Sequence, residues 1–255
     1  MARMKPQLYI LTGGSRGMGL AMAGQILRRG HTLVSISRQR NTSLESLAQA
    51  HQASLSQWQF DLGDPQPAAQ QLQQWLSTQD AQSFSRAVLI NNAGVIPPIA
   101  PLSHSDWNAV SQALRVGLEA PMLLTSAFLH ATEAWDMPRQ VLNVSSGLGR
   151  RAIASQATYC AAKAGMDNFS MSVALDEASK PRGAKICSIA PGVIDTDMQL
   201  QLRSASASAF PDVDRFAQLK SSGSLTSAEE AGAKVLAWLE RPDFGNPVLA
   251  DVRQP

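Results

Sequence analysis

Residues 141–169, VLNVSSGLGRRAIASQATYCAAKAGMDNF, hold side chains that can pass a proton to a substrate. Tyr159 and Lys163 are four positions apart, so they share one face of a helix. Free tyrosine has a pKa of about 10 and is too weak an acid at neutral pH. A lysine ammonium beside it favours the phenolate and makes the proton easier to give. The pair therefore predicts proton donation to the alkoxide that forms when a hydride reduces a carbonyl group.

Ser146 is the third side chain with a chemical use. It directly follows the apolar run QVLNVS (140–145), which predicts a strand that ends just upstream of the tyrosine. Its hydroxyl can donate to or accept from a carbonyl oxygen and so orient it, as in a small oxyanion site. We expect Ser146, Tyr159 and Lys163 to be the catalytic residues, with Lys163 also able to bind the ribose hydroxyls of a nicotinamide cofactor.

Four glycines gather near the N-terminus in LTGGSRGMGLAMAGQILRRG (11–30). Gly13 can adopt a positive φ in a tight turn, and Gly17 lets the start of a helix approach a pyrophosphate. Gly19 lets that helix pack close to a sheet. The spacing is neither the general dinucleotide fingerprint nor a P-loop. A plain strand–helix corner is the alternative, but the position after the first strand favours a dinucleotide site.

The residues after the second predicted strand indicate which dinucleotide. An acidic residue there would bind the ribose 2′-hydroxyl of NAD. Here TLVSIS (32–37) is followed by Arg38, and the first carboxylate is Glu45. The Arg38 guanidinium can meet a 2′-phosphate with several donors, and Arg16 on the neighbouring loop can reach the same group. The pattern predicts NADP(H), unless both arginines are only solvated surface residues.

Short β-type runs alternate with longer helical ones along the whole chain. Strands are predicted at 7–12, 32–37, 56–60, 86–91, 140–145, 184–190 and 247–252, and helices at 17–29, 43–52, 65–77, 105–135, 155–179 and 227–240. This alternation predicts an α/β fold with one doubly wound parallel sheet, a Rossmann fold with helices on both faces. Residues 1–255 form a single domain in this interpretation, and the Ser-, Ala- and Gln-rich residues 195–222 form a mobile helical flap.

Composition excludes several classes of protein. A 255-residue chain with 44% hydrophobic and 16% charged residues is globular, and a net charge of +2 does not favour nucleic acid. No apolar stretch is long enough to cross a membrane, and the N-terminal apolar run is too short for a signal peptide. Two cysteines without an export signal favour a cytoplasmic location. Four scattered histidines give no ligand spacing, so no metal site is expected.

The chain resembles the short-chain dehydrogenase/reductase family over essentially its full length. The motifs that carry the resemblance are TGGSRGMG, NNAG (91–94), NVSS, YCAAK and APGVIDTDM (190–198). It implies the catalytic roles given above, Asp61 near the adenine, and Asn91 and Ala93 along the ribose. With the residues already named, the expected cofactor-binding set is Gly13, Ser15, Arg16, Gly17, Met18, Arg38, Asp61, Leu62, Asn91, Ala93, Gly94, Tyr159, Lys163, Pro191, Gly192, Val193 and Thr196.

One position departs from the family pattern. The stretch VGLEAP (116–121) places Gly117 where the resemblance implies an asparagine that completes a catalytic tetrad. That asparagine is thought to hold a water of the proton relay largely through its backbone carbonyl, which glycine also has. The relay can therefore survive, although the tetrad is incomplete.

A narrower resemblance concerns the substrate. NVSSGLGR, APGVIDTDMQLQLR and a late DVR are similar to the sepiapterin and benzil reductase branch, which implies small dicarbonyl or pterin substrates. Val95, Ile96, Leu148, Ile194 and the flap can form an apolar pocket. Asp251 is either an anchor for a polar substrate or a solvated carboxylate. The family resemblance also implies a homodimer or homotetramer that forms through the helices near 105–135 and 155–179.

Three other functions compete with an NADPH-dependent carbonyl reductase. A non-catalytic NADPH sensor or scaffold is consistent with Gly117, but it has no need of Tyr159. A methyltransferase with a similar glycine loop leaves Tyr159, Lys163 and Arg38 unexplained. A serine hydrolase is disfavoured because Ser146 lacks a G-x-S-x-G elbow and has no obvious histidine partner.

Overall fold

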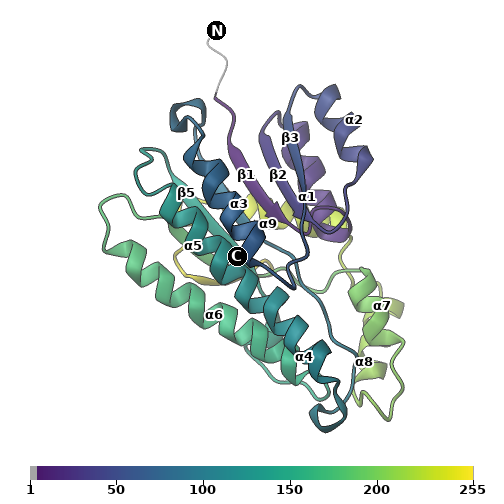
Figure 1. Cartoon of the computed structure of the whole chain (residues 1–255). Coiled ribbons are helices and arrows are strands. Elements are labelled where there is room, and N and C mark those ends of the chain that lie inside the picture. The colour runs from purple at the N-terminus through teal and green to yellow at the C-terminus, as the bar shows by residue number, and fades with distance from the viewer. Residues whose placement is uncertain (1–4, 255) are drawn as a thin grey trace.

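A computed structural model describes residues 5–254 and builds them around one parallel β-sheet of seven strands (Figure 1). In sequence order the strands are β1 (Leu8–Thr12), β2 (Thr32–Ser37), β3 (Ser54–Gln59), β4 (Ala87–Asn91), β5 (Arg139–Val144), β6 (Lys185–Ala190) and β7 (Leu249–Asp251). Their spatial order is β3-β2-β1-β4-β5-β6-β7, so the chain changes direction across the sheet between β1 and β4. The predicted doubly wound α/β fold is confirmed.

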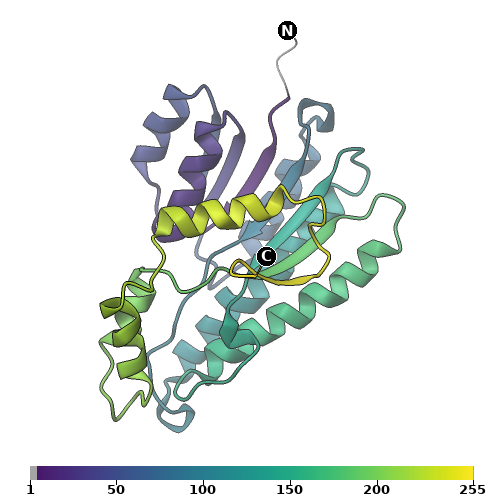
Figure 2. The same ribbon diagram turned by 180° about the vertical axis from the view of Figure 1, so that it is seen from behind.

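Helices cover both faces of the sheet (Figures 1 and 2). One face carries α1 (Gly17–Arg28), α2 (Thr42–Ala50) and α9 (Ala228–Leu239), and the other carries α3 (Gln66–Ser77), α4 (Trp107–Leu114), α5 (Ala120–Ala131) and α6 (Ala157–Ala178). Strand residues alternate between the two cores. Tyr9 and Leu11 pack under α1 and α9, whereas Leu8 and Ile10 pack under α3 and α5. Burial on both faces explains why the central strands β1 and β4 are mostly apolar, whereas the edge strand β3 is polar and only partly buried.

The predicted helix at 105–135 is interrupted. A π-helical segment, Arg115–Glu119, separates α4 from α5 and contains Gly117. Pro121 lies four residues after Gly117 and has no N–H, so it cannot donate the usual helical hydrogen bond to the Gly117 carbonyl. The proline therefore accounts for the break, and periodicity alone did not predict it. Most other boundaries match the prediction, although β3 begins at Ser54, two residues before the predicted start.

Two short helices stand away from the sheet, beside the carboxyl ends of the strands (Figure 1). They are α7 (Asp197–Arg203) and α8 (Val213–Ser221), within the predicted flap. Leu202, Phe210, Val213 and Phe216 form a small buried core of their own there. The flap is thus folded and helical, with its own apolar contacts. Within residues 5–254, no helix has the length and apolar character needed to span a bilayer.

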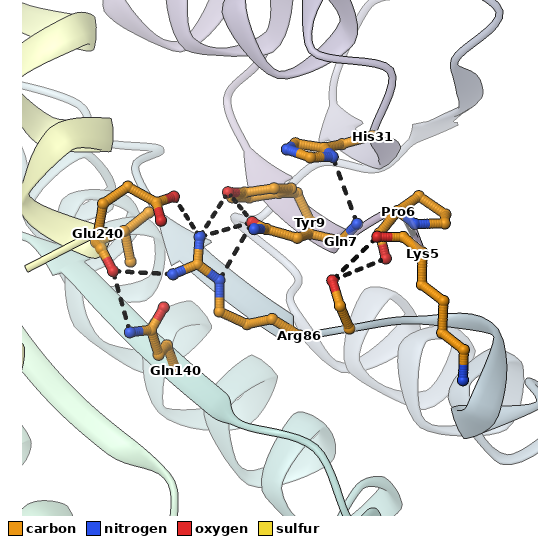
Figure 3. Close-up of polar contacts among 10 residues, drawn as sticks. Lys5, Pro6, Gln7, Tyr9, His31, Arg86, Gln140 and Glu240 are labelled. Atoms are coloured by element: carbon orange, nitrogen blue, oxygen red, sulfur yellow. Dashed lines mark hydrogen bonds and ion pairs between the residues drawn. The ribbon is translucent and has the colours of Figure 1, made fainter. Parts of the chain in front are cut away.

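A polar cluster fastens the opposite, amino-terminal edge of the sheet (Figure 3). The Arg86 guanidinium donates to Gln7 Oε1 at 2.6 Å and to Tyr9 Oη at 3.2 Å, and it pairs with Glu240. It also donates to the Leu239 carbonyl at 2.9 Å. These contacts join β1, β4 and the end of α9 and leave the carboxyl edge of the sheet free for a site.

Candidate active site

A cavity of about 1130 Å³ opens beyond the carboxyl ends of the strands. This is the edge where ligands bind in open α/β sheets. Parallel register places the ends of the central strands side by side: Leu11 pairs with Ile90, and Asn91 with Asn143. The cavity brings together Ser146, Tyr159, Lys163, Gly13, Ser15, Arg16, Gly17, Met18, Arg38, Asp61, Leu62, Ala93, Gly94, Pro191, Gly192, Val193 and Thr196, which is every predicted site residue except Asn91.

The glycine loop has the shape that its residues predicted. Gly13 and Gly17 have φ values of +71° and +54°, which residues with a Cβ rarely adopt. A Cβ on Gly19 would lie 2.1 Å from the Gly13 carbonyl oxygen, so the loop and α1 can pack this closely only without one. The start of α1 has no side-chain cap and no acidic residue in its first turn. Its N–H groups can therefore receive an anion such as a pyrophosphate.

Thr12 and Asn92 belong to the motifs TGGSRGMG and NNAG, but sequence reasoning assigned a role to neither residue. Thr12 Oγ1 accepts hydrogen bonds from the Asn92 and Ala93 N–H groups, each at 2.9 Å. The Asn92 side-chain amide donates to the Thr12 carbonyl at 2.9 Å. These bonds hold the ends of β1 and β4 together, which fixes the loop that borders the cavity. A threonine at a strand end gives no sequence signal for such a contact.

Ser37 and Arg38 line the cavity at the end of β2. The Ser37 hydroxyl is buried and has no hydrogen-bond partner among the described residues. A buried polar atom without a partner is costly, so a ligand atom here would satisfy it. Within residues 5–254, the Arg38 guanidinium forms no ion pair or hydrogen bond to another side chain. This end of the cavity fits a phosphorylated ribose.

Arg16 differs from expectation in its contacts. Its Nη1 atom lies 3.2 Å from Asp197 Oδ2, so it bridges the glycine loop to α7 of the flap. Both side chains are mostly exposed, at 69% and 79%, so the ion pair contributes little to stability. Arg16 still lines the cavity and can exchange this partner for a ligand phosphate.

Asn91 is the one predicted site residue that does not line the cavity. It is 1% exposed, and its amide donates to Asn143 Oδ1 at 2.8 Å and to Thr125 Oγ1 at 3.1 Å. The side chain therefore joins β4 to β5 and α5 inside the molecule. Its expected place along the ribose stays a prediction.

The three catalytic candidates meet between β5 and α6. Ser146 follows β5, and its hydroxyl accepts from the Leu148 N–H at 3.1 Å. Tyr159 lies in the first turn of α6, and the Lys163 ammonium lies 5.8 Å from the centre of its ring. All three side chains line the cavity. The predicted helix thus places both residues of the Tyr-x-x-x-Lys motif on the face that meets Ser146.

Lys163 is held by the backbone of β5. Its Nζ atom donates to the Val144 carbonyl at 2.7 Å, and the residue is 4% exposed. Burial lowers the pKa of Lys163 to about 8, and the Asp167 carboxylate one helical turn away opposes that shift. Asp167 is fixed in turn by Ser188 Oγ at 2.6 Å and by Arg150 Nε at 3.2 Å. A buried carboxylate therefore keeps part of the lysine charge at neutral pH.

The pKa of Tyr159 does not follow the sequence-based expectation. Burial raises the pKa of Tyr159, and hydrogen bonding to the nearby Ser146 hydroxyl lowers it. We expected the Lys163 ammonium to lower it, but that ammonium points to the Val144 carbonyl and burial dominates. The phenol is therefore protonated at neutral pH, as a proton donor must be.

Gly117 lies in the π-helical segment and faces α6. It is buried, and a Cβ on it would lie 3.1 Å from Ala162 Cβ, directly before Lys163 in the chain. Because Pro121 has no N–H, the Gly117 carbonyl cannot accept the hydrogen bond that a regular α-helix would give it. An asparagine at this position would have to displace α6 slightly. The departure from the family pattern is thus matched by close packing of the two helices.

Apolar side chains form part of the remaining lining. Val95, Ile96, Leu148 and Ile194 all line the cavity as expected, together with Leu202 and Phe216 of the flap. These side chains give the site next to Ser146 and Tyr159 an apolar wall.

Asp251 is neither a substrate anchor nor a solvated carboxylate. It is 8% exposed, does not line the cavity, and accepts from Arg253 Nε at 2.8 Å. The Arg253 guanidinium holds the pKa of Asp251 below its usual range. Its charge is therefore already matched within the protein, so it is neither solvated nor free to anchor a substrate.

Comparisons with known proteins agree with this geometry. A family model described as short chain dehydrogenase matches residues 7–207. The chain is 35% identical over 235 residues to a benzil reductase ((S)-benzoin forming) of Bacillus cereus, with 92% of this chain and 94% of that protein covered. It is 30% identical over 253 residues to the sepiapterin reductase of Meriones unguiculatus, with coverage of 95% and 94%. The crystal structure of the KRED1-Pglu enzyme superposes with a TM-score of 0.77 at 27% identity, over 92% of this chain and 95% of that one.

Proposed function

The chain belongs to the short-chain dehydrogenase family, and from that membership we propose that it is an NADPH-dependent carbonyl reductase. In this proposal a hydride reaches the carbonyl carbon of a ketone, a diketone or a pterin side chain, and the product is an alcohol. The observation that carries the proposal is the convergence of Ser146, Tyr159 and Lys163 on one wall of the cavity. The names of the two relatives, a benzil reductase and a sepiapterin reductase, support a small carbonyl substrate.

The residues around the cavity fit a nicotinamide dinucleotide. The uncapped start of α1 would bind the pyrophosphate, and Asp61 and Leu62 would border the adenine. Ser37 and Arg38 would bind the phosphorylated ribose. Ala93 and Gly94 would lie beside the second ribose. Pro191, Gly192, Val193 and Thr196 would border the nicotinamide and pyrophosphate. When bound, NADPH supplies the hydride.

The proposed mechanism assigns one step to each catalytic side chain. The Ser146 hydroxyl donates a hydrogen bond to the substrate carbonyl oxygen and orients it. Tyr159, which burial keeps protonated, gives its proton to that oxygen as negative charge develops there. The Lys163 ammonium, 5.8 Å from the centre of the Tyr159 ring, supplies positive charge near the phenolate that forms, and a water near Gly117 would return a proton from solvent.

Three further proposals concern domain organisation, oligomeric state and cellular location. Residues 1–255 form one domain in this proposal. The flap at 195–222 is a mobile cover, since α7 and α8 have a small core of their own. Exposed Met122, Met171 and Leu175 on α5 and α6 support a homodimer or homotetramer through these helices. Two free thiols, Cys160 and Cys187, are compatible with the cytoplasm.

Gly117 favours one other function, a sensor that binds NADPH without turnover. The assay that separates the two measures loss of NADPH absorbance with aromatic diketones, pterins and simple aldehydes, and NADH runs beside it. A reductase consumes NADPH with at least one of these carbonyls. Binding of NADPH without consumption on any of them would favour the sensor.

Arg38→Asp tests the choice of cofactor. It removes the guanidinium and places a carboxylate where NAD-specific proteins use one, so the KM for NADPH rises by about tenfold or more. The KM for NADH in the same variant stays within about twofold and is the internal control. Equal changes for both cofactors would contradict the assignment.

A further inference from the structure

We propose that the physiological substrate carries a carboxylate in addition to its reducible carbonyl, and that Arg151 and Arg215 bind that carboxylate. This inference rests on the proposed reductase function and names its substrate class. Both arginines line the cavity, and neither belongs to the catalytic or cofactor-binding residues given above.

The two arginines come from segments that meet at the catalytic end of the cavity. Arg151 lies in the loop that begins with Ser146, and Arg215 lies on α8 next to Phe216. Ile153, two residues after Arg151, packs against the small core that contains Phe216. The loop and the helix are therefore neighbours. Arg38 lies at the end of β2, which is the cofactor end, so the two arginines are separate from the proposed phosphate site.

The other charged groups near this end already have partners. Asp195 accepts from Arg203 at 3.4 Å and from Lys220 at 2.5 Å, and Asp197 pairs with Arg16. Arg253 pairs with the buried carboxylate of Asp251. Six basic residues and only three acidic ones, Asp61, Asp195 and Asp197, line the cavity. The cavity therefore has an excess of positive charge that internal ion pairs do not cancel.

Arg151 and Arg215 are the unmatched cations at this end. Neither guanidinium forms an ion pair or a hydrogen bond to another residue between 5 and 254. Asp212 and Asp214 are close to Arg215 in sequence, but neither lines the cavity. Both arginines are exposed, and two exposed guanidinium groups that face one cavity can each donate charge-assisted hydrogen bonds to a carboxylate. A neutral diketone would leave both without a partner.

The test compares two substrates that share an aromatic ring and a ketone and differ in charge. Benzoylformate carries a carboxylate, and its methyl ester does not. We expect the wild type to show kcat/KM for the acid about tenfold above that for the ester. Arg151→Gln and Arg215→Gln should each lower kcat/KM for the acid about tenfold, while values for the ester stay within about twofold.

Two controls keep the result specific. Arg28→Gln removes the same charge from an exposed position on α1 outside the cavity, and should leave both substrates unaffected. The KM for NADPH should be unchanged in Arg151→Gln and Arg215→Gln, which shows that the arginines do not act through the cofactor.

The outcomes separate this inference from the function on which it rests. If the ester or benzil is reduced and the acid is neither preferred nor affected by the substitutions, the carboxylate site is wrong and the reductase stands. Equal losses for acid and ester would show that the arginines only shape the cavity, which also overturns the inference. If no carbonyl compound is reduced, the proposed function itself fails and the inference fails with it.

Discussion

Burial of Lys163 determines how the site should respond to pH. Its pKa is lowered to about 8, whereas the pKa of Tyr159 is raised, so the lysine is the first of the two to lose its proton. As pH rises through about 8, the charge that stabilises the phenolate is lost. We expect kcat/KM for carbonyl reduction to fall with an apparent pKa of about 8.

The same residue gives a control against simple denaturation. Because its pKa is lower in the folded chain than in the unfolded chain, the unfolded state binds more protons between the two values. The contribution of Lys163 to the free energy of unfolding therefore increases with pH above about 8. Urea unfolding at each pH of the activity profile should show that activity falls without a matching loss of stability. A flat activity profile through this range would contradict the role of Lys163.

At the scale of elements, the packing of α1 against the glycine loop leaves no room for a side chain. A Cβ on Gly19 would lie 2.1 Å from the Gly13 carbonyl oxygen, whereas one on Gly24 would lie no closer than 3.4 Å to any neighbour. Gly19→Ala should cost about 1–3 kcal/mol of unfolding free energy and weaken NADPH binding, because loop and helix must separate. Gly24→Ala, in the same helix, should be neutral or stabilise by up to about 1 kcal/mol. Denaturant unfolding and NADPH titration measure both, and similar behaviour of the two variants would refute this account.

Elements were predictable from sequence wherever local pattern decided them. β2 has the predicted bounds, and Ser227 caps α9 with its side chain, as a serine before a helix indicates. The break at Arg115–Glu119 was not predicted, because the helical pattern of residues 105–135 continues past Pro121. The pair of Tyr159 and Lys163 was predictable because one helix sets their spacing.

Contacts between residues far apart in the sequence could not be predicted from local patterns. Arg16 and Asp197 are 181 positions apart, and only the tertiary fold brings the flap to the glycine loop. The partners of Asn91 and Asp251 are likewise fixed by strand order, which motifs do not specify. The pKa of Tyr159 depends on how deeply its side chain is buried. The motif alone therefore does not predict whether that pKa is raised or lowered.

At the scale of the whole molecule, stability and chemistry lie at opposite edges of the sheet. Arg86 joins β1, β4 and α9 at the amino-terminal edge (Figure 3), and its side chain is only 11% exposed. Arg86→Met leaves the Leu239 carbonyl without this donor, so we expect a loss of about 1–3 kcal/mol and a Tm lower by roughly 5 °C. The kcat/KM of the variant should be unchanged below its Tm.

A matched substitution tests that separation. Arg182→Met removes an arginine whose ion pair with Asp136 is exposed, so calorimetry should detect almost no change in Tm. Equal effects of the two substitutions on Tm, or a selective loss of activity in Arg86→Met, would contradict the division between the two edges.

Transfer of a deuterium label shows whether the protein delivers hydride to a carbonyl and whether Tyr159 is needed. The protein is mixed with benzil and NADPH that carries deuterium at the transferred position, and the product is analysed for deuterium on the carbinol carbon. We predict labelled benzoin from the wild type and a rate lower by about a hundredfold or more in Tyr159→Phe at saturating NADPH. NADPH binding by the wild type without label in any product, or equal rates in both proteins, would contradict the account.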